Sequence, residues 1–281
     1  MDVKNHDTRP ISLPIKKIIK ETDTIWTFVF EYELGSRPGQ FVMLWIPGVD
    51  ENPFSVAYDN GKEFWLTIAK VGDATEKLFE MGEGAKVGIR GPFGTSYEVL
   101  EGDHLALLAG GYGAAPMYNV AVNALEKGCV VEMIVGARSA DLLLYEGRVE
   151  ELAKKYGEEK IRYHAATDDG SKGHKGYNTE VLEEMLSADD LAGGALTRVF
   201  ACGPEVMMKK GAELATKKGV ASAVSLERYM KCGMGVCGQC CMDDSGIRAC
   251  KEGPVYDGAE ALKLSEFGKY HRDSVGRKVD W

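Results

Sequence analysis

Five of the seven cysteines in this sequence of 281 residues lie in one glycine-rich stretch, MKCGMGVCGQCCMDDSGIRAC, at positions 230–250. Four of them follow the pattern C-x4-C-x2-C, then nine residues and a last cysteine: Cys232, Cys237, Cys240 and Cys250. This is the spacing of plant-type [2Fe–2S] sites, in which four thiolates hold two iron atoms. The stretch therefore predicts an iron–sulfur cluster.

Glycines in the same stretch support a tightly turned loop. Gly233, Gly235 and Gly238 allow the backbone to adopt positive φ and to approach sulfur closely. Amide groups brought so near can donate hydrogen bonds to the sulfurs and tune the reduction potential.

Zinc is the alternative chemistry for these thiols. Structural zinc sites usually pair two C-x2-C knuckles, and here only Cys237 and Cys240 form one. Cys241 follows a predicted ligand directly, and we interpret it as a spare thiol. The spacing favours the cluster over zinc.

A second pattern with chemical meaning is LALLAGGYGAAPM, at positions 105–117. It places Gly110, Gly111 and Gly113 between a predicted strand and a predicted helix, where backbone amides can bind a diphosphate. Pro116 stands where a Rossmann fingerprint has its third glycine, and it suits the first turn of a helix. The loop predicts a nucleotide site, and a plain strand-to-helix turn is the alternative.

Two further segments are candidate site elements. FACGPEVM repeats the strand–turn–helix theme and puts Cys202, followed by Gly203 and Pro204, at the end of a strand, where ligands collect in open α/β sheets. In VGDATEKLF, Gly72 to Thr75 begin an amphipathic helix. Its amides could meet a phosphate, or Asp73 or Thr75 could serve as an ordinary cap.

The surrounding pattern divides the chain into four parts. From Ile11 to Leu100, β-rich runs at 24–32, 39–47, 63–71 and 85–93 alternate with turns such as GVDENP at 48–53, which predicts an antiparallel barrel. Strands then alternate with helices up to Leu226, as in a parallel sheet covered on both faces. The expected domains are a barrel at 1–102, an α/β nucleotide domain at 103–225, a cluster domain at 226–258 and a tail, with a possible helix, at 259–281.

Composition limits the partners and the cellular compartment that we expect for the protein. The net charge of −9 and the absence of a basic block argue against nucleic-acid binding. No run reaches the roughly 18 apolar residues that span a bilayer, and the polar start lacks a secretory signal. We therefore expect a cytoplasmic protein without membrane contact.

The order of barrel, nucleotide sheet and C-x4-C-x2-C cluster resembles the ferredoxin reductase superfamily. Within it, AGGYGAAPM, ACGPEVMM and ERYMKCGMGVCGQC resemble the electron-transfer subunits of NAD-dependent dihydroorotate dehydrogenases. The resemblance covers about positions 11–258. It implies an oxidoreductase subunit with FAD, NAD(P) and a [2Fe–2S] cluster, and a hetero-oligomer with an FMN-containing subunit that oxidises dihydroorotate.

The resemblance also assigns roles to residues. Pro53, Phe54 and Ser55 would lie beside the isoalloxazine ring, and Cys202 near the position of hydride transfer. Where the family often has arginine, this chain has Asn52, which lacks the charge that serves the flavin phosphates. The expected cofactor-binding residues are Asn52, Pro53, Phe54, Ser55, Gly72, Asp73, Ala74, Thr75, Gly110, Gly111, Gly113, Pro116, Gly203 and Pro204.

Several alternatives stay open at this level. A subunit with the same cofactors could serve a ferredoxin:NADP oxidoreductase or a hydrogenase complex. A zinc-stabilised, nucleotide-binding regulatory module is the alternative outside redox chemistry. NAD and NADP are not distinguished: Arg138 and Ser139 follow the second strand of the nucleotide domain, where a 2′-phosphate could bind, and Arg138 could equally be a solvated loop residue. Trp281 is either a stacking partner for the flavin or an exposed end.

Overall fold

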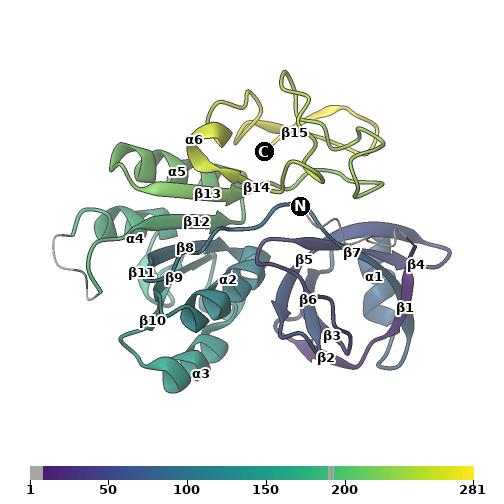
Figure 1. The fold of residues 1–281 in the computed structure, drawn as a ribbon, viewed down its shortest axis with the longest axis horizontal. Coiled ribbons are helices and arrows are strands. Elements are labelled where there is room, and N and C mark those ends of the chain that lie inside the picture. The colour runs from purple at the N-terminus through teal and green to yellow at the C-terminus, as the bar shows by residue number, and fades with distance from the viewer. Residues whose placement is uncertain (1–8, 189–190, 192) are drawn as a thin grey trace.

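The computed structural model describes residues 9–188, 191 and 193–281. Two seven-stranded sheets lie side by side, and the C-terminal segment lies across both of them (Figure 1). This arrangement confirms the predicted fold class, a barrel followed by an α/β sheet and a small loop domain. Among the described residues, no helix is both long enough and apolar enough to cross a bilayer.

The first sheet is antiparallel throughout and curls around a core of aromatic and branched side chains. One short helix, α1 (Asp73–Glu80), connects the two strands of this sheet that come last in sequence. In spatial order the strands are β1 (Ile11–Pro14), β7 (Lys86–Phe93), β4 (Phe41–Ile46), β5 (Asp50–Asp59), β6 (Phe64–Ala69), β3 (Ile25–Phe30) and β2 (Lys17–Lys20).

One predicted turn in this sheet is wrong. The pattern GVDENP at 48–53 predicts a separation between strands, but β5 begins at Asp50 and continues through Pro53. Asp, Asn and Pro are poor strand formers. Backbone pairing with β4, from Ile46–Asp50 to Phe41–Ser55, overrides that local preference.

The second sheet carries the nucleotide loops. Its central strand β8 (His104–Gly110) is buried at every position, as expected for a parallel strand covered on both faces. In spatial order the strands are β11 (His174–Lys175), β10 (Ile161–Thr167), β9 (Val130–Ala137), β8, β12 (Arg198–Cys202), β13 (Ala221–Ser225) and β14 (Val255–Asp257). Because β14 pairs antiparallel with β13, the sheet is mixed, and its last strand comes from the cysteine segment.

Helices cover both faces of this sheet. One face packs against α2 (Ala114–Glu126) and α3 (Glu146–Tyr156), and the other against α4 (Asn178–Met185) and α5 (Glu205–Lys217). Two 3₁₀ turns, η1 (Gly111–Gly113) and η2 (Ala140–Leu142), follow β8 and β9. The face bearing α2 also contacts the barrel, which brings the two sheets together.

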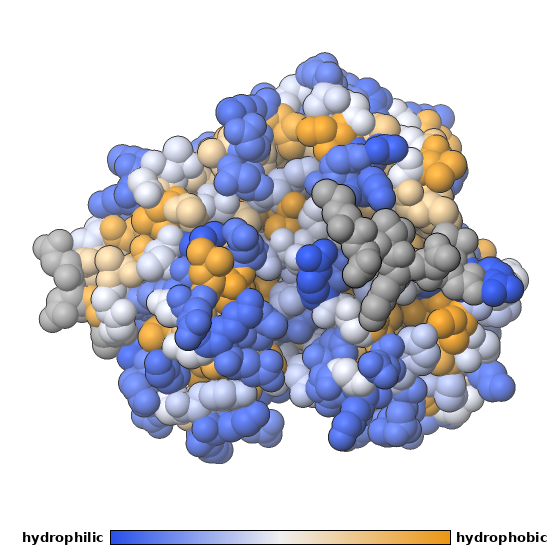
Figure 2. Space-filling model, in the orientation of Figure 1, coloured by the Kyte–Doolittle hydropathy of each residue, from blue (hydrophilic) through white to orange (hydrophobic). Residues whose placement is uncertain are grey.

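The tail contains the possible helix expected from sequence, as one short turn, and a hairpin after it. After the short helix α6 (Gly258–Ala261), strands β15 (Tyr270–Arg272) and β16 (Lys278–Asp280) pair antiparallel. Trp281 stacks on His271 and donates a hydrogen bond to Glu205, and it is not among the residues that line the cavity described below. The visible face of the molecule is largely hydrophilic, with scattered apolar residues (Figure 2).

Candidate functional site

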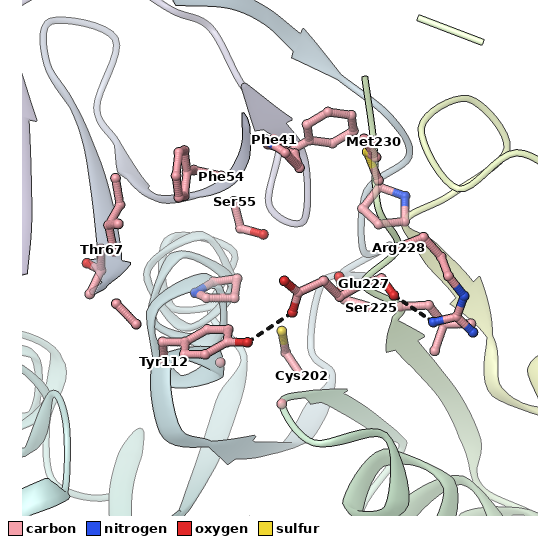
Figure 3. Close-up of a pocket in the computed structure, with 18 of the residues that line it drawn as sticks. Phe41, Phe54, Ser55, Thr67, Tyr112, Cys202, Ser225, Glu227, Arg228 and Met230 are labelled. Atoms are coloured by element: carbon pink, nitrogen blue, oxygen red, sulfur yellow. Dashed lines mark hydrogen bonds between the residues drawn. The ribbon is translucent and has the colours of Figure 1, made fainter. Parts of the chain in front are cut away.

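A cavity lies where the barrel, the nucleotide sheet and the cysteine segment meet (Figure 3). The barrel contributes one wall, the two glycine loops a second, and the chain after β13 a third. Its lining is mainly apolar, as in most cofactor pockets. The lining includes Phe41, Pro53, Phe54, Ser55, Tyr112, Gly113, Pro116, Cys202, Gly203, Glu227, Met230 and Pro254.

The barrel wall contains three residues expected beside a flavin ring. Pro53, Phe54 and Ser55 lie on β5 and line the cavity, whereas Asn52 is not among the lining residues. Val71 also lines the cavity, two residues before the start of α1. The predicted ring-binding residues therefore line the cavity, whereas Gly72 to Thr75 are not among its lining residues.

The start of α1 combines a cap with free amides. Gly72 is the cap residue, and the Thr75 hydroxyl accepts hydrogen bonds from the amides of Val71 at 2.9 Å and Gly72 at 3.0 Å. Thr75 thus has the local capping role that was one of the two alternatives. The amides of Asp73 and Ala74 belong to the first turn, which has no intrahelical acceptors for them.

The two glycine loops pack backbone against backbone. A Cβ on Gly113 would lie 2.2 Å from the carbonyl oxygen of Cys202, and one on Gly203 would lie 2.8 Å from the amide nitrogen of Gly110. A Cβ on Gly110 would come within 2.6 Å of the Pro204 ring. Gly111, by contrast, has φ +53° and open space around its Cα. The predicted nucleotide residues of both loops therefore form one continuous surface.

Cys202 lies at the end of β12 and lines the cavity. Burial raises the pKa of its thiol to about 12, and the charge of Glu227 adds to the effect. The side chain is therefore a neutral thiol at physiological pH, which argues against a thiolate nucleophile.

Sequence reasoning missed two polar residues of the cavity. The Tyr112 hydroxyl donates a hydrogen bond to Oε2 of Glu227 at 3.0 Å, beside the Cys202 thiol (Figure 3). The charge of Glu227 and burial raise the pKa of Tyr112. Glu227 comes two residues after β13, at the carboxyl edge of the sheet, and that position was the signal that could have identified it.

The cysteine loop is turned so that its amides point at sulfur. Gly233, Gly235 and Gly238 all have positive φ, as expected. The Gly235 amide donates to Sγ of Cys250 at 3.1 Å, and the Val236 amide donates to Sγ of Cys232 at 3.3 Å. Such bonds stabilise thiolates, the form that ligates iron.

The pKa values in this loop shift in both directions, and the hydrogen bond between Cys240 and Cys250 raises the pKa of Cys250. A hydrogen bond with Cys250 lowers the pKa of Cys240 to about 6. Burial raises the pKa of Cys232, but amide hydrogen bonds outweigh it and bring the value to about 7. Cys241, the predicted spare thiol, has a raised pKa because of burial and the neighbouring Cys240.

The four thiols do not form a compact single-ion site. Within the described part of the chain, no three His, Cys, Asp or Glu side chains converge closely enough to hold one metal ion. A cluster with two irons needs ligands spread around a larger centre than one tetrahedral ion does. Four cysteines at this spacing are the donor set of plant-type [2Fe–2S] sites.

The cavity and the cysteine loop share parts of the chain. Met230 lines the cavity two residues before Cys232, and Pro254 lines it four residues after Cys250. Met43 of β4 bridges them as well, because it pairs with Pro53 and would lie 2.7 Å from a Cβ on Gly233. A cofactor bound in the cavity would therefore lie close to a metal centre bound by the four thiols.

Two domain families match this chain. One, described as an oxidoreductase NAD-binding domain, matches residues 107–213. The other, described as the iron–sulfur cluster binding domain of dihydroorotate dehydrogenase B, matches residues 227–262. The second match favours iron–sulfur over zinc for the cysteine loop.

Relatives match nearly the whole chain. A Methanocaldococcus jannaschii protein named "Probable dihydroorotate dehydrogenase B (NAD(+)), electron transfer subunit" is 42% identical over 271 residues, 96% of this chain and 98% of that one. A Methanocella arvoryzae protein of the same name is 45% identical over 274 residues, with the same two coverages.

A solved structure supports the same assignment. The structure of an NADH-dependent reduced ferredoxin-NADP oxidoreductase, described in connection with flavin-based electron bifurcation, has 28% identity and a TM-score of 0.75 over 88% of each chain. The resemblance inferred from the motifs is thus confirmed. The chain belongs to the family of electron transfer subunits of dihydroorotate dehydrogenase B, which are oxidoreductase components with a nicotinamide-binding and an iron–sulfur domain.

Proposed function

We propose that this chain passes electrons between NAD and an FMN-containing partner subunit that oxidises dihydroorotate. FAD in the cavity and a [2Fe–2S] cluster on Cys232, Cys237, Cys240 and Cys250 would be the two relay groups. The observation that carries the proposal is the shared boundary of cavity and cysteine loop at Met230 and Pro254. The names of the relatives support NAD and a catalytic partner.

The chemistry explains why the groups belong in this order. A nicotinamide exchanges a hydride, an iron–sulfur cluster exchanges one electron at a time, and a flavin can do both. The flavin therefore belongs between the other two. No acid–base residue of this chain has to take part in the relay.

We assign the residues accordingly. Pro53, Phe54 and Ser55 would contact the flavin ring, with Cys202 on the nicotinamide side of it. The segment from Gly72 to Thr75 would face the flavin phosphates with the amides of Asp73 and Ala74, because the Gly72 amide already donates to the Thr75 hydroxyl. The loops with Gly110, Gly111, Gly113, Pro116, Gly203 and Pro204 would bind the nicotinamide dinucleotide.

The proposed domains keep the boundaries expected from sequence, 1–102, 103–225, 226–258 and 259–281. A cytoplasmic location is part of the proposal, because none of the seven cysteines forms a disulfide, as is usual in a reducing compartment.

Anaerobic purification tests the cofactors. We expect flavin released as FAD, two irons per chain and an electron paramagnetic resonance (EPR) signal of a reduced [2Fe–2S] cluster. Cys237→Ser should abolish the EPR signal, whereas the matched variant Cys241→Ser should keep it. A colourless protein with one zinc would overturn the proposal.

Co-purification tests the partner. Together with a dihydroorotate-oxidising flavoprotein subunit, the chain should form NADH from dihydroorotate and NAD⁺. A complex that uses ferredoxin as the electron donor would instead favour a second candidate function, that of a subunit of a ferredoxin:NADP oxidoreductase. The structural similarity to a ferredoxin-NADP oxidoreductase points to this candidate.

A further inference from the structure

Arg90 of β7 is a buried cation in contact with the cysteine loop. Only 7% of the residue is exposed. Its Nε and Nη2 donate to the two carboxylate oxygens of Glu51 on β5, at 2.7 and 2.6 Å. Nη2 also donates to the backbone carbonyl of Cys232 at 3.2 Å. The Arg90–Glu51 pair of the barrel therefore contacts the backbone of Cys232, the first proposed cluster ligand.

The pair lies between the barrel and the loop. Arg90 is opposite Met43 on β4, and its guanidinium lies 5.8 Å from the Phe93 ring centroid. A Cβ on Gly233 would meet both Met43 and Phe93. Burying an ion pair costs desolvation energy, and a hydrophobic pair of similar volume would hold the same interface. Packing alone therefore does not explain why an ion pair, Arg90 with Glu51, occupies this position.

Reduction of a cluster supplies such a reason. Each electron that the cluster accepts adds one negative charge to it, and no bond or proton is exchanged. A fixed cation nearby stabilises the reduced form, and a fixed anion destabilises it. Both effects are larger for buried charges than for exposed ones, which water and salt screen.

We propose that the Arg90–Glu51 pair sets the redox potential of the cluster relative to the flavin. Arg90 raises the potential through the Cys232 carbonyl, and Glu51 offsets part of that effect and orients the guanidinium. This inference rests on the proposed function, because it requires Cys232 to be a cluster ligand. Arg90 is a positioning residue, since it acts through the ligand and not on the cluster itself.

A second pair in the same loop provides a matched control. Arg248 donates to the carbonyl of Gly235 at 2.7 Å and pairs with Glu252. Its side chain is 39% exposed and that of Glu252 is 41% exposed, against 8% for Arg90 and 23% for Glu51. Both are Arg–Glu pairs whose guanidinium donates to a loop carbonyl. The control pair is more exposed to solvent, and its carbonyl belongs to Gly235 and not to a proposed ligand.

Redox potentiometry of the full-length holoprotein, followed by the EPR signal of the cluster, tests the inference. Arg90→Gln should lower the midpoint potential and Glu51→Gln should raise it. Each should change the reduced-to-oxidised ratio at a fixed potential about tenfold, which is 59 mV for one electron. Arg248→Gln and Glu252→Gln should shift the midpoint potential less, and 1 M salt should make those two shifts smaller still.

The outcomes separate the possibilities. Equal or same-sign shifts in Arg90→Gln and Glu51→Gln, with the cluster intact, would overturn the inference. If Arg90→Gln loses the cluster, Glu51→Gln and Arg90→Lys decide, because both keep the cation. A midpoint potential that does not rise in Glu51→Gln, or that falls by about 59 mV in Arg90→Lys, then refutes the proposal. A wild-type protein without a [2Fe–2S] signal would refute the proposed function instead.

Discussion

The hydroxyl of Tyr112 and the carboxylate of Glu227 meet across the cavity at 3.0 Å, although 115 residues separate them in sequence. Tyr112 belongs to the first nucleotide loop, and Glu227 begins the segment that leads to the cysteines. Their contact places one negative charge beside the Cys202 thiol, where we propose the nicotinamide to lie.

That charge should distinguish the two forms of the nucleotide. The nicotinamide ring of NAD⁺ is cationic and that of NADH is neutral, so a nearby carboxylate favours NAD⁺. Glu227→Gln should weaken NAD⁺ binding about fivefold to tenfold relative to NADH, a change of roughly 1 kcal/mol. Calorimetric titration with each nucleotide measures the ratio. Tyr112→Phe keeps the carboxylate and serves as the control, and an equal loss for both nucleotides in Glu227→Gln would contradict the expectation.

Close packing of the two glycine loops leads to a second prediction. Gly113 has an ordinary helical φ of −61°, so space and not conformation requires glycine there. In Gly113→Ala the new Cβ must push the loop away from Cys202. We expect kcat/KM for NADH, measured with an artificial electron acceptor, to fall at least about tenfold, because small displacements of binding groups are costly.

Gly147 offers the comparison. It lies in α3, and nothing lies within 4 Å of the position that a Cβ would occupy there. Gly147→Ala should therefore be neutral or stabilising by up to about 1 kcal/mol. NADH kinetics unchanged in Gly113→Ala would show that the loops tolerate separation.

What sequence could predict was local. The C-x4-C-x2-C spacing, the glycines after β8 and the alternation of strands with helices are all encoded within short windows, and the fold class followed from them. The start of β5 at Asp50 was not predictable in this way, because Asp50, Asn52 and Pro53 each disfavour a strand. Only hydrogen bonding to β4 makes that segment extended.

Contacts between segments that are distant in sequence could not be predicted either. Arg90 and the Cys232 carbonyl are 142 residues apart, and nothing near Arg90 in sequence indicates a cysteine loop. Ligand spacing predicts which thiols gather, but the charges around them are set by how the barrel docks on the loop.

The protonation state of Cys202 gives a third prediction. Because burial raises the pKa of its thiol to about 12, almost no thiolate is present at pH 8. Iodoacetamide should therefore modify Cys202 much more slowly than a free cysteine in solution. Peptide mass spectrometry of the cofactor-loaded protein measures the rate, and fast modification at pH 8 would show that the thiol is activated.

A buried carboxylate far from the cavity should contribute to stability in a pH-dependent way. Glu132 on β9 lies 2.7 Å from Nε2 of His164 and accepts a hydrogen bond from Arg162 at 2.5 Å. Burial raises its pKa, but hydrogen bonds with His104 and His164 and the charge of Arg162 outweigh burial and lower the value to about 2. Since the folded pKa lies below the ordinary 4.5, the stabilisation is complete above pH 4.5 and is lost as pH falls toward 2.

Glu132→Gln tests this account. At pH 7 the variant should lose about 3 kcal/mol, because His164 and Arg162 lose their buried partner. Below about pH 5 the difference from wild type should narrow, since the wild-type carboxylate begins to lose its advantage there. Thermal unfolding midpoints between pH 7 and pH 4, followed by tryptophan fluorescence, measure both effects. Glu180→Gln removes the exposed partner of His174 and should change the midpoint little at any pH, as surface pairs do; a constant gap between Glu132→Gln and wild type down to pH 4 would assign the loss to packing and not to charge.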